Sequence, residues 1–211
     1  MTGAGPVARA AELAALGHRG SLTGPERARL ERAGTADPDP RVRATALAAL
    51  VRAGPGAARG AWAAALDDPA PAVRRRAAEL TPDLSDPTVI TALLGLLADT
   101  DVTVVEATAW AIGELGDDAV ARGAGLALAN TASHHRDALA REAAVAALGA
   151  LGDPAGLPAI LGACSDKPAV RRRAVLALAP FDGPDVEAAI DAALEDRDWQ
   201  VRQAAEDLRA N

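Results

Sequence analysis

The sequence predicts an all-α solenoid, in which helical hairpins stack side by side in a row. Three observations support this fold class: a repeated segment, an acidic turn ahead of each copy, and a composition rich in small apolar residues. Six similar segments begin at residues 42, 73, 104, 140, 170 and 201, at intervals of 31, 31, 36, 30 and 31 residues. A unit of this length cannot bury its apolar face alone, so neighbouring units are expected to stack.

Each repeated segment predicts the second helix of a hairpin. Its first residue, numbered position 0, is Val in five copies and Ala at 140. At 100° per residue, positions 0, 4, 7, 8 and 11 share one helix face, and these positions are mostly apolar. We expect them to form the core, and we expect positions 2, 6 and 9 to point away from it.

A short acidic turn precedes the second helices. An Asp stands four or five residues before position 0 in five copies, where its carboxylate can accept the free amides of a helix start. An Arg stands at position 1 in five copies, and pairing with these aspartates would form a ladder of ion pairs along the turns. The residues are Asp37, Asp68, Asp99, Asp166 and Asp196, and Arg43, Arg74, Arg141, Arg171 and Arg202.

The pattern predicts one capping helix followed by six helix pairs. The cap is helix 6–16, and residues 1–24 form the cap and its loop. The pairs span 25–209: 25–33 with 41–52, 57–66 with 71–80, 87–98 with 102–115, 118–131 with 137–151, 155–164 with 168–179, and 185–195 with 198–209. We expect residues 1–211 to form a single domain, with His134 and His135 inside the extra residues that lengthen the fourth repeat.

Composition excludes several other classes. Half of the 211 residues are hydrophobic but only 2% are aromatic, which disfavours a β-sandwich or barrel. A single cysteine, Cys164, excludes an internal disulfide and fits a reducing compartment. The chain shows neither a long apolar stretch nor a signal-like start, so we expect a cytoplasmic protein without membrane contact. The net charge of −7 disfavours a nucleic-acid partner.

Several motifs resemble the HEAT repeat family, in particular the short bacterial repeats named after phycobilisome lyases. They are the segments 68–74 (DPAPAVR), 109–117 (AWAIGELGD), 147–154 (ALGALGDP) and 196–202 (DRDWQVR), and the resemblance covers roughly residues 25–209. It implies a right-handed α-solenoid of about six HEAT-like hairpins, whose second helices line a concave surface. The motif residues stack one repeat on the next, so they predict fold far more strongly than function.

The resemblance implies that positions 2, 6 and 9 face a partner. Trp110, at position 6 of the third pair, is a large aromatic at an outward position and is predicted to be the anchor for a protein or peptide. Glu106 and Glu142 flank it, and Arg75 and Arg172 would give charge selectivity at either end. Two further tryptophans, Trp62 and Trp199, are interpreted as structural.

The most favoured function is a non-enzymatic scaffold or adaptor that binds a protein or peptide on its concave face. We expect a monomer or weak homo-oligomer with no cofactor, metal or catalytic residue. Cys164 is interpreted as a buried, inert thiol. The HEAT-like deoxyhypusine hydroxylases hold two irons with His-Glu pairs, whereas the matching dipeptides here are Val105-Glu106 and Arg141-Glu142, which lack His.

Two enzyme alternatives on this fold remain open. A HEAT-like DNA glycosylase acting on alkylated bases could use Trp110 with Glu106 or Glu142. However, residues 61–130 carry 11 acidic and 4 basic groups, which would repel phosphates there. A bilin lyase or isomerase is suggested only by the name of the repeat subtype, because no motif beyond the repeat supports it.

Overall fold

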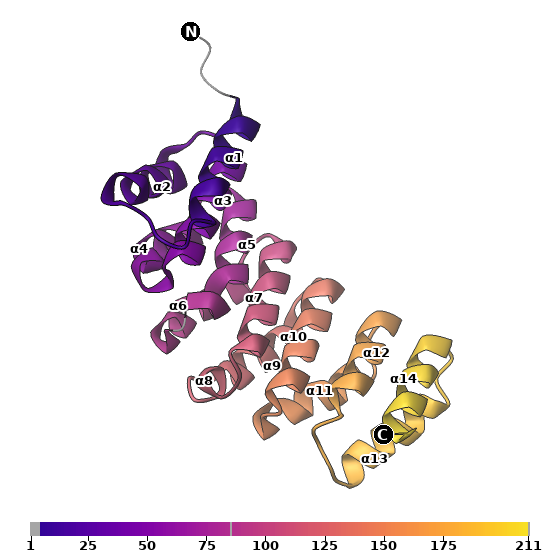
Figure 1. The fold of residues 1–211 in the computed structure, drawn as a ribbon. Coiled ribbons are helices and arrows are strands. Elements are labelled where there is room, and N and C mark those ends of the chain that lie inside the picture. Colours follow the sequence, from indigo (N-terminus) through magenta and orange to yellow (C-terminus); the bar gives the residue numbers. More distant parts are fainter. Residues whose placement is uncertain (1–4, 85, 211) are drawn as a thin grey trace. The chain divides into compact units, whose positions relative to one another are not determined.

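The computed structural model describes residues 5–84 and 86–210, and the chain divides into two compact units, Met1–Leu96 and Leu97–Asn211. Helices stack within each unit and no strand occurs in the described residues, so the protein is an all-α solenoid, as predicted (Figure 1). Residues 1–4 of the predicted cap lie outside the described part. Among the described helices, none combines the length and hydrophobicity that crossing a membrane requires.

The unit Met1–Leu96 contains two layers of helices. The helices α1, α3 and α5 pack against one another in a row, and α2 and α4 pack beside them (Figure 1). The elements are α1 (Pro6–Gly17), α2 (Gly24–Ala36), α3 (Pro40–Ala53), α4 (Pro55–Leu66), α5 (Pro71–Leu80), η1 (Thr81–Leu84), η2 (Pro87–Val89) and α6 (Ile90–Gly95). The short helix η3 (Leu96–Ala98) spans the division between the units.

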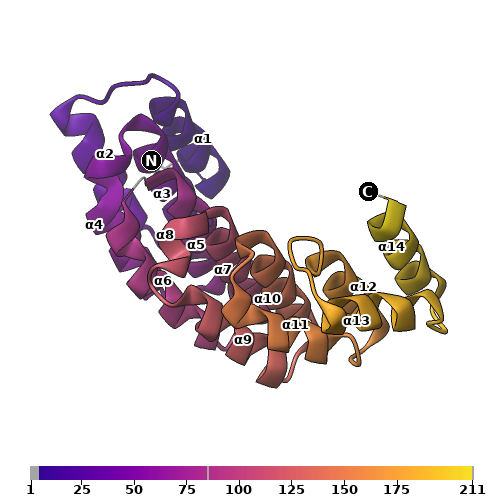
Figure 2. The same ribbon diagram turned by 90° about the horizontal axis from the view of Figure 1, so that it is seen from below.

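The unit Leu97–Asn211 repeats this arrangement. The second helices α7, α10, α12 and α14 form one row, and the first helices α9, α11 and α13 form the other (Figure 2). The elements are α7 (Val102–Glu114), α8 (Gly116–Val120), α9 (Ala124–His134), α10 (Ala138–Leu151), η4 (Pro154–Gly156), α11 (Leu157–Ala163), α12 (Pro168–Ala177), α13 (Pro184–Leu194) and α14 (Trp199–Ala210).

The prediction of one continuous helix over residues 118–131 is wrong, because the chain forms the two helices α8 and α9 there. Gly123 has a φ of 75° in the left-handed region and separates the two helices. The turn that contains His135 is regular. The His135 carbonyl accepts a hydrogen bond from Arg141, just as the Asp196 carbonyl accepts one from Arg202 in the corresponding turn. The additional residues of this longer repeat are therefore accommodated around α8, ahead of His134 and His135.

The predicted core is confirmed at its most regular position. Position 0 is buried in all six second helices. Trp62 is also buried, as predicted, and its indole N–H donates to the Ala77 carbonyl at 2.9 Å. Position 9 differs from the prediction in two repeats, where Gly113 and Gly149 face the next second helix. A Cβ added at Gly149 would lie 2.7 Å from the Cα of Ala177, so glycine permits the close approach of α10 and α12.

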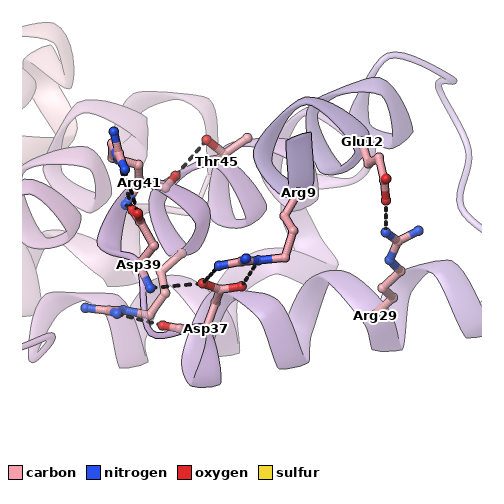
Figure 3. A network of polar contacts seen from close by, with 8 residues as sticks. Arg9, Glu12, Arg29, Asp37, Asp39, Arg41 and Thr45 are labelled. Carbon is pink, nitrogen blue, oxygen red and sulfur yellow. Dashed lines mark hydrogen bonds and ion pairs between the residues drawn. The ribbon is translucent and has the colours of Figure 1, made fainter. Parts of the chain in front are cut away.

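The predicted ladder of Arg–Asp pairs is present within both units. Each arginine forms two parallel hydrogen bonds to the aspartate of the following turn, at 2.6–2.8 Å, in the pairs Arg43–Asp68, Arg141–Asp166 and Arg171–Asp196. The sequence prediction missed a further pair, in which Arg9 of α1 binds Asp37 at 2.9 Å through two nitrogens (Figure 3). The cap is therefore attached to the first full hairpin by the same contact that joins later hairpins.

Candidate partner-binding site

A hollow of about 370 Å³ lies on the second-helix face of the unit Leu97–Asn211. We call it the Trp110 hollow. It is lined by Glu106, Trp110, Gly113, Glu114, Leu139, Glu142, Ala143, Ala146, Ala147, Ala150 and Arg173, which belong to α7, α10 and α12. Three of the five predicted partner-binding residues, Glu106, Trp110 and Glu142, therefore lie together.

Helix α7 places an aromatic ring between two carboxylates. Asp101 caps the helix by accepting from the Thr103 amide at 2.9 Å, which fixes where the helix begins. Glu106, Trp110 and Glu114 follow at intervals of four residues, so they share one helix face. The Trp110 side chain is 51% exposed, and both glutamates are exposed. The indole is thus open to solvent, with acidic groups on either side of it.

Helix α10 supplies the opposite wall and the floor. The Asp137 carboxylate caps its start by accepting from the Leu139 amide at 2.9 Å. Four alanines of α10 line the hollow, and their short side chains leave the space that a larger residue would fill. Glu142 faces the hollow from this helix and lies 3.6 Å from the guanidinium of Arg173 on α12. Arg173 therefore neutralises part of the acidic wall.

Arg75 and Arg172 lie outside the Trp110 hollow. Arg75 belongs to the unit Met1–Leu96, where its guanidinium binds Glu79 one turn along α5 at 2.8 Å. Arg172 is exposed and lines a smaller hollow of about 120 Å³ with Leu176 and Trp199. The expectation that Trp199 packs structurally is wrong, because 65% of its side chain is exposed at the start of α14.

The sequence prediction also missed residues in the Trp110 hollow. Glu114 could have been found, because it lies one turn after Trp110 on the face already assigned to Glu106. Leu139 stands one residue before position 0, so the repeat register already placed it away from the core. It is 37% exposed in the structure. Arg173 enters from the neighbouring repeat, and no spacing within α7 or α10 indicates that contact.

The described residues offer little reactive chemistry elsewhere. No group of three or more His, Cys, Asp or Glu side chains in ranges 5–84 and 86–210 is arranged to hold a metal ion. Burial raises the pKa of the Cys164 thiol to about 11, so little thiolate is present at neutral pH. The Trp110 hollow thus presents an aromatic ring and carboxylates.

Comparison with known families agrees with the stacked hairpins. The sequence profile of HEAT repeats matches residues 59–123 and 125–209, which is most of the chain. The protein belongs to the HEAT repeat family. The α7 residues that line the Trp110 hollow fall in the first matched range, and its α10 and α12 residues fall in the second. No curated protein sequence matches the chain.

Solved structures are similar to this chain at low sequence identity. The Escherichia coli protein YibA is 17% identical with a TM-score of 0.64, over 97% of this chain and 74% of YibA. An engineered protein is 18% identical with a TM-score of 0.55, over 94% of this chain and 97% of its own. Human deoxyhypusine hydroxylase is 20% identical with a TM-score of 0.48, over 99% of this chain and 80% of the hydroxylase chain. At such identities the likeness to YibA and to the engineered protein concerns the fold alone.

Proposed function

We propose that this HEAT-repeat protein is a scaffold or adaptor that binds a protein or peptide partner on the second-helix face of residues 97–211. The observation that carries the proposal is the half-exposed Trp110 at the wall of a hollow with a small-residue floor. A large aromatic side chain left open to water is a typical anchor of a protein interface.

The surroundings of Trp110 favour binding over catalysis. The helices that carry the hollow are held by buried Arg–Asp pairs, such as Arg141–Asp166. A surface that is already formed loses little conformational entropy when a partner docks. No His, Lys or Cys lines the hollow, so a reaction there would have to rely on the carboxylates alone.

Affinity capture from cells of the source organism tests this function. Three baits are compared: the wild type, Trp110→Ala, and Leu126→Ala as a matched control. Leu126 lies on α9 of the same unit and is 67% exposed, but it is outside the Trp110 hollow. We expect a partner that the wild type and Leu126→Ala retain and that Trp110→Ala loses.

Two results would contradict the proposal. One is an identical set of captured proteins on all three baits, which would remove Trp110 from the interface. The other is retention of duplex DNA with a steep dependence on salt, together with release of alkylated bases. That result would favour a HEAT-like DNA glycosylase instead.

A further inference from the structure

We infer that the Trp110 hollow binds an arginine side chain carried by a basic segment of the partner. This inference rests on the proposed function and specifies the chemistry of the ligand. Three observations support it: the charge of the unit, the carboxylates beside Trp110 that pair with no described residue, and the half-exposed side chain of Trp110.

The unit Leu97–Asn211 is strongly acidic. It contains 19 acidic and 10 basic residues, a net charge of −9, whereas residues 1–96 contain 10 acidic and 12 basic residues. Clefts lined by one sign of charge attract ligands of the opposite sign and raise their association rate. A basic segment would therefore be drawn to this unit.

The carboxylates inside the hollow have unused hydrogen-bonding capacity. Glu106 and Glu114 form no hydrogen bond or ion pair with any residue that the structure describes, and both project from α7 on the face of Trp110. Glu142 lies opposite, and only the guanidinium of Arg173, at 3.6 Å, offsets its charge. The hollow thus contains three carboxylates and one cation.

The ring and the carboxylates together fit a guanidinium. A cation above an indole face is attracted by the ring's electron density, and tryptophan is the strongest aromatic partner for it. A guanidinium is planar, so it can stack on Trp110 while its edge donates to Glu106 or Glu114. The alanines of α10 leave room beside the ring for the aliphatic part of the arginine.

A random dodecapeptide library displayed on phage provides the test. It is selected on the wild-type chain, with Trp110→Ala as the counter-bait, and the best peptide is then synthesised with each arginine replaced by citrulline. Citrulline keeps the planar shape but carries no charge. We expect the Trp110-dependent peptides to contain arginine, and one citrulline replacement to weaken binding about tenfold.

Two further measurements locate the arginine. Titration with the arginine peptide should shift the indole N–H signal of Trp110 in a ¹H–¹⁵N spectrum, and the Trp62 signal should stay in place. The double variant Glu106→Gln/Glu114→Gln should weaken binding by a similar factor. Neither glutamate forms a hydrogen bond or ion pair with a described residue, so this variant is expected to fold normally.

The outcomes separate the inference from the proposed function. Peptides that depend on Trp110 but lack arginine, or that tolerate citrulline at every site, would overturn the inference and leave the binding function intact. Failure to recover any peptide that depends on Trp110 would count against both.

Discussion

Arg43 and Asp68 form a two-pronged ion pair, in which Nε and Nη2 of the arginine each lie 2.7 Å from a carboxylate oxygen. The same geometry recurs at Arg141–Asp166 and Arg171–Asp196, and all six side chains are less than one-fifth exposed. Each arginine also donates through Nη1 to a carbonyl of its own turn, as Arg43 does to Asp37 at 2.8 Å. One side chain therefore ties two successive turns together.

Replacing Arg171 with alanine should destabilise the protein strongly. The Asp196 carboxylate would be left largely buried without its cation, and breaking a buried pair in this way costs about 3 kcal/mol or more. The free energy of unfolding, measured by urea denaturation, checks this. The neighbouring Arg172→Ala is the control, since Arg172 is exposed and should change stability by less than about 0.5 kcal/mol. Equal losses in the two variants would contradict the ladder's structural role.

The Arg141–Asp166 pair should also make the free energy of unfolding depend on pH. Hydrogen bonds from Arg141 hold the pKa of Asp166 below its usual value. A carboxyl with a lowered folded-state pKa stabilises the protein fully above its unfolded-state pKa, about 3.9, and loses that contribution as the pH falls toward the folded value. Urea titrations of the wild type and Asp166→Asn should therefore converge between about pH 5 and pH 2. A constant difference across that range would show that the charge of Asp166 contributes nothing.

Gly149 should tolerate no side chain. An added Cβ would meet both the Cα and the Cβ of Ala177 at 2.7 Å, so α10 and α12 would have to separate. We expect Gly149→Ala to cost about 1–3 kcal/mol in the free energy of unfolding. Gly162→Ala is the matched control, because no atom lies within 4 Å of its added Cβ and alanine favours the helix by up to about 1 kcal/mol. A neutral Gly149→Ala would contradict the observed helix spacing.

Thr108 should be replaceable with a gain in stability. It stands at position 4 of its repeat, where the other copies have Ala46, Ala77, Ala144, Ala174 and Ala205. Its side chain is fully buried, and its hydroxyl has no hydrogen-bond partner in ranges 5–84 and 86–210. Thr108→Val keeps the shape and removes the unpaired hydroxyl, so thermal unfolding should show a gain of about 1 kcal/mol. A loss of stability would mean that the hydroxyl has a partner in solution.

The local repeat signal is sufficient to predict most of the fold. Position 0, the junction aspartates and the Arg at position 1 act within one hairpin or between neighbouring hairpins, so their spacing carries the information. The break at Gly123 was missed because a single glycine can end a helix or lie within it, and only the backbone conformation decides. Arg9 was missed because α1 has no sequence repeat to reveal its register.

The candidate site was only partly predictable. Helical spacing placed Glu106 and Trp110 on one face, and the repeat register placed Glu142 opposite them. The entry of Arg173, the pairing of Arg75 with Glu79 and the exposure of Trp199 depend on how neighbouring side chains fill space. Periodicity describes which face a residue occupies, but it does not describe how far the next helix covers that face.

The role of Trp110 as a binding anchor is tested most directly by comparing peptide affinity and thermal stability in the wild type and Trp110→Ala. We expect the arginine peptide to bind the variant at least about tenfold more weakly, because the anchor is lost, while the melting temperature changes by no more than about 2 °C. An unchanged affinity combined with a fall of several degrees in melting temperature would contradict that role, because Trp110 would then stabilise the fold without taking part in binding.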